Sequence, residues 1–261
     1  LNLGGKSMAI QMWVKHDGTG DQDATLVRKG NGGVEARFVG SGEGKPIYFD
    51  LGRSFQSITS NSGIPANQWT HVTINYDGNN LQIYINGELD AQTGEDADID
   101  TDSGSPFRIG IGPSESSARY DGQIDDLRIW NTSLNLFQKQ TNPYVELSGS
   151  ESGLVSYYTF DESGSTIVDQ AGQNNLSLEA TASKITPDAF PVTPDVYATP
   201  SNGSVTVEWD ERLGTLGSNN DADEFRVYRS TGPDGANRQM VTSIGAGTSS
   251  YTDTGVSNGE T

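Results

Sequence analysis

A two-residue alternation of apolar and polar side chains runs through most of this sequence and limits the folds it can adopt. Residues 7–15 (SMAIQMWVK) set a row of apolar side chains on one face, namely Met8, Ile10, Met12 and Val14. Residues 71–89 hold two further alternating segments around a DGNN turn, and Asn86-Gly87 then favours a type I′ turn. Because successive side chains of a β-strand point to opposite faces, this pattern predicts antiparallel strands with one apolar face each.

The same pattern continues along the chain and favours one fold class. Residues 107–112 (FRIGIG) and 122–130 (GQIDDLRIW) read as strands, and turn signals recur roughly every 8 to 12 residues, as in sandwiches and barrels. Only 132–146 fits a short helix, which Pro143 would end. There are no alternating strand–helix units and no internal repeat. We therefore predict an all-β protein.

Composition excludes several classes of function. The chain has no cysteine, which removes disulfides, thiolate metal sites and a cysteine nucleophile, and leans towards a bacterial source. It carries 16 basic and 35 acidic residues, a net charge of −19, so nucleic acid and anionic membranes should repel it. Two readings of this charge stay open: solubility in saline surroundings, or a calcium-rich environment. No apolar run is long enough to predict membrane insertion.

A proline-rich stretch divides the chain in two. Residues 184–195 contain three prolines and predict a semi-rigid linker. Strand-like segments resume after it at 205–210, 224–230, 240–245 and 249–254. We expect a first domain over 1–183 and a second over 196–261.

The first domain carries five motifs in the order of a known family. They lie at 13–15 (WVK), 67–89, 107–112, 120–134 (YDGQIDDLRIWNTSL) and 147–180. Residues 1–183 resemble bacterial laminin-G-like jelly rolls of the concanavalin-A-like superfamily. The resemblance implies a sandwich that binds carbohydrate or protein and often holds a structural calcium ion; some relatives are glycoside hydrolases. Such domains usually have one or two strands before the position of Ser7, so we expect the N-terminal strand to be missing here.

The second domain resembles a bacterial fibronectin type III domain. Trp209 after Val205 and Val207, then Val227-Tyr228 and Tyr251, carry the resemblance. It implies a spacer sandwich, C-terminally truncated at Thr261, with an unpaired sheet edge.

Asp125 is the first candidate metal ligand. Alternation places it on the apolar face of 122–130 with Leu127 and Ile129, where a carboxylate needs a partner. The resemblance implies that an acidic residue here binds a rim calcium with backbone carbonyls. Asp126 is the second candidate. The alternative is that Asp125 pairs with an arginine or caps backbone amides.

Other acidic segments are weaker candidates. Residues 94–105 contain Glu95, Asp96, Asp98, Asp100 and Asp102 but lack an EF-hand register, so we expect a solvated loop. The paired-calcium cluster of pentraxin relatives is reduced at 113–122 to Glu115 and Asp121.

No catalytic residues are predicted. The nearest string to a Glu-x-Asp-x-Glu glycosidase signature, Glu208-Trp-Asp210-Glu211, falls in the second domain and has the wrong spacing. His16 and His71 lack metal-ligand spacing, and there is no Gly-x-Ser-x-Gly elbow.

Sugar-binding aromatic residues cannot be assigned from the sequence. Trp13, Trp69 and Trp130 lie in strand motifs and are expected in packed positions. Four further aromatic residues are weak alternatives: Tyr48, Phe55, Tyr120 and Tyr157.

These observations predict a non-catalytic binding or adhesion module of a large secreted or cell-surface bacterial protein, monomeric and stabilised by calcium. Its expected ligand is a glycan or an extracellular protein. Two alternatives stay open: an accessory module of a glycan-degrading enzyme whose catalytic domain lies outside 1–261, and a purely structural spacer.

Overall fold

The structure is a computed structural model that divides into two compact units, Leu1–Lys184 (unit 1) and Ile185–Thr261 (unit 2). The described residues are 3, 5–30, 33–42, 44–52, 57–94, 96, 98–99, 105–112, 118–141, 146–178, 182–184, 196–209, 224–230, 239–245 and 248–256. Within them both units are built from antiparallel strands, which confirms the predicted all-β class.

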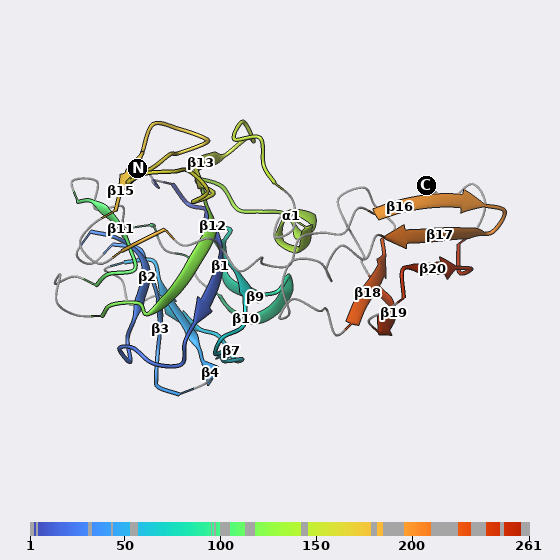
Figure 1. Cartoon of the computed structure of the whole chain (residues 1–261), viewed down its shortest axis with the longest axis horizontal. Coiled ribbons are helices and arrows are strands. Elements are labelled where there is room, and N and C mark those ends of the chain that lie inside the picture. Colours follow the sequence, from blue (N-terminus) through green and yellow to red (C-terminus); the bar gives the residue numbers. More distant parts are fainter. Residues whose placement is uncertain are drawn as a thin grey trace. The chain divides into compact units, whose positions relative to one another are not determined.

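Unit 1 contains two main antiparallel sheets (Figure 1). The six-stranded sheet has the order β10-β9-β8-β1-β12-β13, formed by β1 (Met8–His16), β8 (Thr70–Tyr76), β9 (Asn80–Ile85), β10 (Glu88–Gly94), β12 (Gly122–Trp130) and β13 (Leu154–Tyr158). The five-stranded sheet has the order β11-β2-β3-β5-β6, formed by β2 (Thr25–Lys29), β3 (Glu35–Phe38), β5 (Ile47–Asp50), β6 (Ser57–Thr59) and β11 (Phe107–Ile109). Two small ladders join β4 (Gly44–Lys45) to β7 (Ile64–Pro65) and β14 (Thr166–Ile167) to β15 (Leu176–Ser177).

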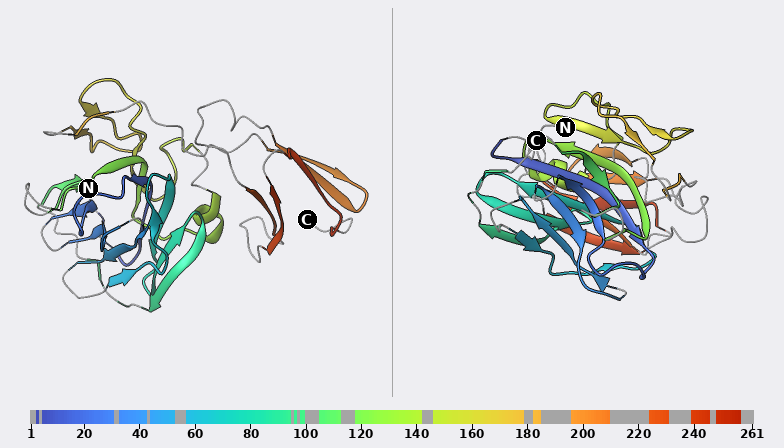
Figure 2. Two further views of the ribbon diagram at one scale, coloured as in Figure 1. Left: turned by 60° about the horizontal axis from the view of Figure 1, so that its bottom comes forward. Right: turned by 90° about the vertical axis from the view of Figure 1, so that its left-hand side faces the viewer.

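The two sheets pack face to face around one apolar core (Figure 2). The predicted apolar row of β1 (Met8, Ile10, Met12, Val14) is fully buried in this core. The five-stranded sheet contributes its alternate positions, among them Ala36, Phe38, Phe49 and Ile58. Alternation therefore placed these faces correctly.

The hairpin between β8 and β9 has the predicted register. Its apolar positions pair directly as Val72 with Ile85, Ile74 with Ile83 and Tyr76 with Leu81. In the turn that follows, Asn86 and Gly87 both have positive φ, 50° and 81°. Both central positions of a type I′ turn require this region, which Asn and Gly tolerate best.

The later part of unit 1 completes the six-stranded sheet. β13 pairs with β12, where Tyr158 lies opposite Leu127. The following loop is held by Asp169, a buried carboxylate that accepts hydrogen bonds from the Tyr157 amide at 2.9 Å and the Ser156 hydroxyl at 2.9 Å. It also accepts from the amides of Ala171 and Asn174. These bonds hold the pKa of Asp169 below its usual value, although burial alone would raise it.

A short helix, α1 (Leu136–Thr141), follows β12, where the sequence predicted one. Its start is a reciprocal cap: the Gln138 amide donates to Asn135 Oδ1 at 2.8 Å, and the Asn135 amide donates to Gln138 Oε1 at 3.0 Å. Figure 1 shows α1 on the side of the six-stranded sheet away from β2 and β3. Pro143, the predicted end of the helix, lies outside the described residues.

Unit 2 has two small sheets. One joins β16 (Val196–Ser201), β17 (Ser204–Trp209) and β20 (Ser250–Asp253), and the other joins β18 (Glu224–Arg229) to β19 (Gln239–Gly245). Trp209 is buried, and Arg229 binds Asp253 at 3.2 Å. The fibronectin type III assignment remains a prediction. The predicted linker lies outside the described residues, apart from Lys184.

No helix among the described residues has the length and apolar character needed to cross a membrane.

Candidate functional site

The outer face of the six-stranded sheet is polar but covered. Two rows of side chains cross it: Gln82–Asn75–Ala9–Trp130–Leu154 and Tyr84–Thr73–Gln11–Arg128–Tyr157. Trp130 Nε1 donates to Gln11 Oε1 at 3.2 Å, and the Lys139 ammonium of α1 lies 4.7 Å from the Tyr84 ring. Trp130 and Gln11 have no exposed surface, so this part of the face is packed and not presented to solvent.

Asp125 also lies on this covered face, and the prediction that it faces the core is wrong. It pairs with Trp13, whereas its neighbour Ile124 pairs with the core residue Val14. Directly paired residues share a face, so Asp125 is on the outer side. The alternation breaks at Asp126, whose φ of 51° marks a bulge where β12 carries one residue more than β1.

The carboxylate of Asp126 is paired with Arg128. Its two carboxylate oxygens accept hydrogen bonds from Arg128, from Nη2 at 2.5 Å and from Nε at 3.2 Å. The Arg128 guanidinium lies 5.3 Å from the Tyr157 ring centre. Burial raises the pKa of Asp126, and the nearby Arg128 charge opposes that shift. Since both oxygens are occupied by this pair, Asp126 fits poorly as a metal ligand.

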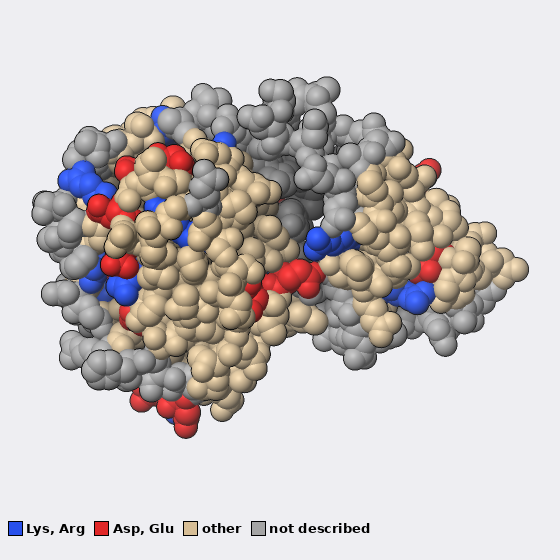
Figure 3. All heavy atoms as spheres, turned by 90° about the horizontal axis from the view of Figure 1, so that it is seen from below, with Lys and Arg blue, Asp and Glu red and all other residues tan. Residues whose placement is uncertain are grey.

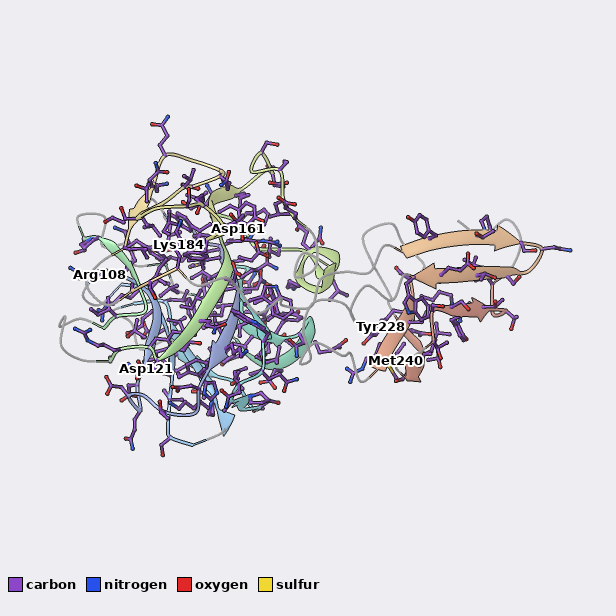
Figure 4. All side chains as sticks on the ribbon, in the orientation of Figure 1. Arg108, Asp121, Asp161, Lys184, Tyr228 and Met240 are labelled. Carbon is purple, nitrogen blue, oxygen red and sulfur yellow. The ribbon has the colours of Figure 1, made fainter. Side chains whose placement is uncertain are left out.

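Asp125 has a less complete set of partners. Its Oδ1 accepts the Asp126 amide at 2.8 Å, and among the described residues no hydrogen bond reaches Oδ2. Burial, followed by repulsion from Asp161 and Asp126, raises the pKa of Asp125 to about 7. Figure 4 shows Asp161 near β12 and β13. A proton or a bound cation would neutralise the Asp125 carboxylate in this arrangement.

The donor chemistry at Asp125 suits calcium, which prefers carboxylate and carbonyl oxygens. Within the part of the chain that the structure describes, however, no three His, Cys, Asp or Glu side chains converge closely enough to hold a metal ion. A calcium ion here would therefore use Asp125 with backbone carbonyls.

The outer face of the five-stranded sheet differs. Two polar rows cross it, Arg108–Arg28–Glu35–Asp50–Ser57 and Thr25–Arg37–Tyr48–Thr59. We call these nine residues the open face, because Ser57 and Thr59 are exposed and most of the others are half-buried. In Figure 3, charged side chains of both signs gather on the side of unit 1 where Figure 1 places β11, β2 and β3.

Arg37 and Tyr48 form the centre of the open face. The Arg37 guanidinium lies 4.3 Å from the centre of the Tyr48 ring, within the range of a cation–π contact. Glu35 sits beside them, with Oε2 at 3.5 Å from Arg37 and Oε1 at 3.6 Å from Arg28. Arg37 Nε is buried and has no hydrogen-bond partner among the described residues.

Asp50 is the second carboxylate of the open face. It lies directly opposite Glu35 in the ladder between β3 and β5, and its Oδ1 accepts the Gly52 amide at 2.9 Å. Burial raises the pKa of Asp50, and the charge of Glu35 adds to the shift. The face thus combines cationic donors, carboxylate acceptors and an aromatic ring.

The aromatic residues are placed mostly as expected. Trp13, Trp69 and Trp130 are packed, with 8% or less of their surface exposed. Tyr157 is also buried, and Tyr120 stacks on Phe38 with ring centres 5.7 Å apart. Of the three weak aromatic candidates that the structure describes, only Tyr48 lies on the open face; Phe55 is outside the described residues.

The remaining candidates form no site within the described ranges. Asp98 is exposed and 3.8 Å from Lys6; Asp96 and Asp121 are also exposed. Glu208 lies exposed on β17 of unit 2. The other acidic candidates, Glu95, Asp100, Asp102, Glu115, Asp210 and Glu211, lie outside the described residues.

The two histidines have different environments. His16 Nε2 is 2.8 Å from the Ile64 carbonyl, and its Nδ1 accepts the Gly18 amide. His71 is fully buried against Trp13, and within the described part of the chain neither ring nitrogen has a hydrogen-bond partner. Burial, with a smaller contribution from Arg128, lowers the pKa of His71 well below its usual value.

Sequence reasoning missed the open face as a unit. The available signal was the alternation of 35–38 (EARF) and 47–50 (IYFD), which sets polar residues opposite the apolar row. The pairing of those strands was needed to bring Glu35, Arg37, Tyr48 and Asp50 together.

Comparison with known proteins gives one family match. A sequence profile of the laminin G type, described as the concanavalin A-like lectin/glucanases superfamily, matches residues 1–137. No curated protein matches the sequence.

Solved structures share the fold. A candidate carbohydrate-binding protein from Bacteroides ovatus aligns with a TM-score of 0.54 and 21% identity, over 67% of this chain and 54% of its own. Domain 4 of an extracellular GH43 arabinanase from Geobacillus stearothermophilus, in complex with arabinotriose, aligns with a TM-score of 0.43 and 22% identity, over 52% and 66%. The chain thus spans about half of the first structure. At these identities the first match shows the fold alone.

Proposed function

Because the chain belongs to the concanavalin A-like lectin/glucanases superfamily, we propose that unit 1 is a non-catalytic module that binds carbohydrate on its open face. One observation carries this proposal: the five-stranded sheet leaves Arg37, Tyr48 and Asp50 partly exposed beside the more buried Glu35, whereas the opposite sheet is covered. A fold shared with binding modules does not fix the ligand, so we infer the ligand class from the chemistry of this face.

That chemistry suits a sugar. Pyranose hydroxyls donate and accept hydrogen bonds, and the open face offers arginine donors beside the carboxylates of Glu35 and Asp50. The half-buried Tyr48 ring, one face of which lies against Arg37, adds apolar surface beside these polar groups for the C–H groups of a sugar. Sites of this kind combine an aromatic platform with a few fixed polar groups.

A non-catalytic role is supported by how the acidic residues are used. Asp125 and Asp126 lie together on the covered face, and Asp126 binds Arg128. On the open face, Glu35 is shared between two arginines. Glycoside hydrolysis requires a free carboxylate nucleophile and an acid group that point to the same open position. Neither Asp125 with Asp126 nor Glu35 with Asp50 provides this combination.

The setting that we propose is extracellular, as one module of a larger surface or secreted protein and as a monomer. An accessory role beside a glycan-degrading domain is the alternative, and it would use the same face. Calcium at Asp125 belongs to this proposal as a stabilising ion, away from the open face.

Glycan-array binding of the full chain tests the proposal, with calcium and with EDTA. We expect binding in both conditions and a loss of signal in Tyr48→Ala. The matched control is Tyr197→Ala, which removes a tyrosine with 63% of its surface exposed on unit 2 and should leave binding unchanged. An array without any glycan signal would contradict the proposal, as would equal losses in the two variants.

A further inference from the structure

The open face carries an excess of positive charge in a strongly acidic chain. Its rows contain three guanidinium groups and two carboxylates, Glu35 and Asp50; Arg37 and Arg108 are half-buried, whereas Arg28 is buried and its Nε donates to the Gly30 carbonyl at 2.8 Å. The whole chain has 16 basic and 35 acidic residues. A local reversal of sign on an accessible surface needs a reason, since net negative charge elsewhere repels anions.

The positive charges are concentrated towards one edge of the sheet. Arg108 lies directly opposite Arg28 in the ladder between β11 and β2, and Figure 4 shows Arg108 on β11. Like charges that face each other across a ladder are unfavourable. The opposite edge, β5 and β6, carries Asp50 and Ser57. The open face is therefore polarised from an arginine side to an acidic side.

Glu35 leaves the hydrogen-bonding capacity of Arg37 largely unused. The contact from Glu35 Oε2 to Arg37 is 3.5 Å and that from Oε1 to Arg28 is 3.6 Å, longer than charge-assisted hydrogen bonds of about 2.7–2.9 Å. The Thr25 hydroxyl also donates a hydrogen bond to Glu35 Oε1 at 3.0 Å.

Arg37 is held ready for a planar anion. The contact at 4.3 Å with Tyr48 holds the guanidinium against the ring and leaves its terminal nitrogens to donate, whereas Nε, which has no partner among the described residues, is itself buried. Its side chain keeps 30% of its surface exposed. The guanidinium edge matches a carboxylate in a two-point contact better than an ammonium does.

We propose that the open face prefers glycans that carry a carboxylate, bound by Arg37 on the central strand β3, with neutral sugar hydroxyls towards Asp50. This inference rests on the proposed carbohydrate-binding function and names its ligand class. The carboxylate can belong to a uronic acid or to a sialic acid, which share this group.

Calorimetric titration of the full chain with two matched pairs tests the inference. One pair is trigalacturonic acid and neutral galactotriose, and the other is 3′-sialyllactose and lactose. At least one acidic member should bind about tenfold or more tightly than its neutral partner, as expected for charge-assisted hydrogen bonds. The pair that shows the difference identifies the source of the carboxylate.

Variants separate the role of Arg37 from net charge. Arg37→Gln should remove the preference for the acidic sugar, and Arg37→Lys should restore only part of it. Lys6→Gln is the control, because it removes one exposed positive charge before β1 of the other sheet and should leave the preference intact. Circular dichroism melting of each variant verifies that unit 1 stays folded.

Several outcomes would overturn the inference. If neutral and acidic partners bind equally, the preference is wrong while the proposed function stands. If EDTA abolishes the preference, calcium and not Arg37 receives the carboxylate. If no glycan binds at all, here or on an array, the proposed function fails with it.

Discussion

The two sheets of unit 1 bury their inner faces in one core, yet they use their outer faces in opposite ways. The six-stranded sheet covers its polar rows, so that Trp130 bonds to Gln11 and Arg128 pairs with Asp126 away from water. The five-stranded sheet leaves Arg37 and Tyr48 accessible. The difference teaches that polarity alone does not mark a binding surface in this fold. What matters is whether the polar groups already have buried partners.

The largest expected effect concerns Asp125 on the covered face. Its pKa is raised to about 7 when folded and lies near 3.8 when unfolded, so the folded state binds the extra proton. Its contribution to stability is full below about pH 4 and is lost as pH rises through 7, a change of up to about 4 kcal/mol. Urea unfolding in EDTA at several pH values measures this.

The control variant is Asp125→Asn, which should flatten that part of the pH profile. Added calcium should also flatten it, because an ion bound at Asp125 favours the carboxylate over the acid. A wild-type melting temperature at pH 7 that calcium leaves unchanged would contradict the calcium prediction and leave the proton as the partner of Asp125.

The next effect compares ion pairs on the two faces. Asp126→Asn leaves the buried Arg128 without its carboxylate and should lower the free energy of unfolding by about 3 kcal/mol. Asparagine tolerates the positive φ of residue 126, so backbone strain does not enter. Glu35→Gln weakens the longer contacts of the open face, one of them to the buried Arg28, and should cost less, about 1–2 kcal/mol. Similar losses in the two variants would remove the distinction between the faces.

A smaller effect concerns His71, the one buried side chain of the covered face in which both ring nitrogens are unpartnered among the described residues. His71→Phe keeps an aromatic ring against Trp13 and removes the free-energy cost of burying two ring nitrogens without hydrogen bonds. It should therefore raise the free energy of unfolding by about 1 kcal/mol.

The pH dependence of His71 has the opposite sign to that of Asp125. Its pKa is lowered on folding, so wild-type stability falls as pH drops below about 6.5, where the unfolded chain takes up the proton. The phenylalanine variant should lack this acid-side loss. A variant that is less stable than the wild type at pH 5 would show that the imidazole has a partner.

How far the sequence predicted the structure depends on the range of the interactions. The register of β8 with β9 followed from local alternation around a short turn, as in Val72 opposite Ile85. The orientation of Asp125 did not, because one bulge residue with positive φ, Asp126, reverses the faces of β12. Alternation cannot reveal such an insertion.

The residues of the open face could not be grouped from the sequence for a related reason. Arg108, Arg28 and Glu35 form one row only because β11, β2 and β3 are neighbours in the sheet, although β11 is distant in the chain. Tyr48 was recognised as a candidate aromatic residue, but only the ladder with β3 places it beneath Arg37.

The central claim is that ligands bind the five-stranded sheet. Titration of the isotope-labelled full chain with a glycan that binds on the array, followed by amide chemical shifts, tests it most directly. We predict that the largest shifts fall in β3, β5 and β11, around Arg37, Tyr48 and Arg108, while β8, β9 and α1 stay unchanged. Shifts centred on α1 or on Asp125 would contradict the account.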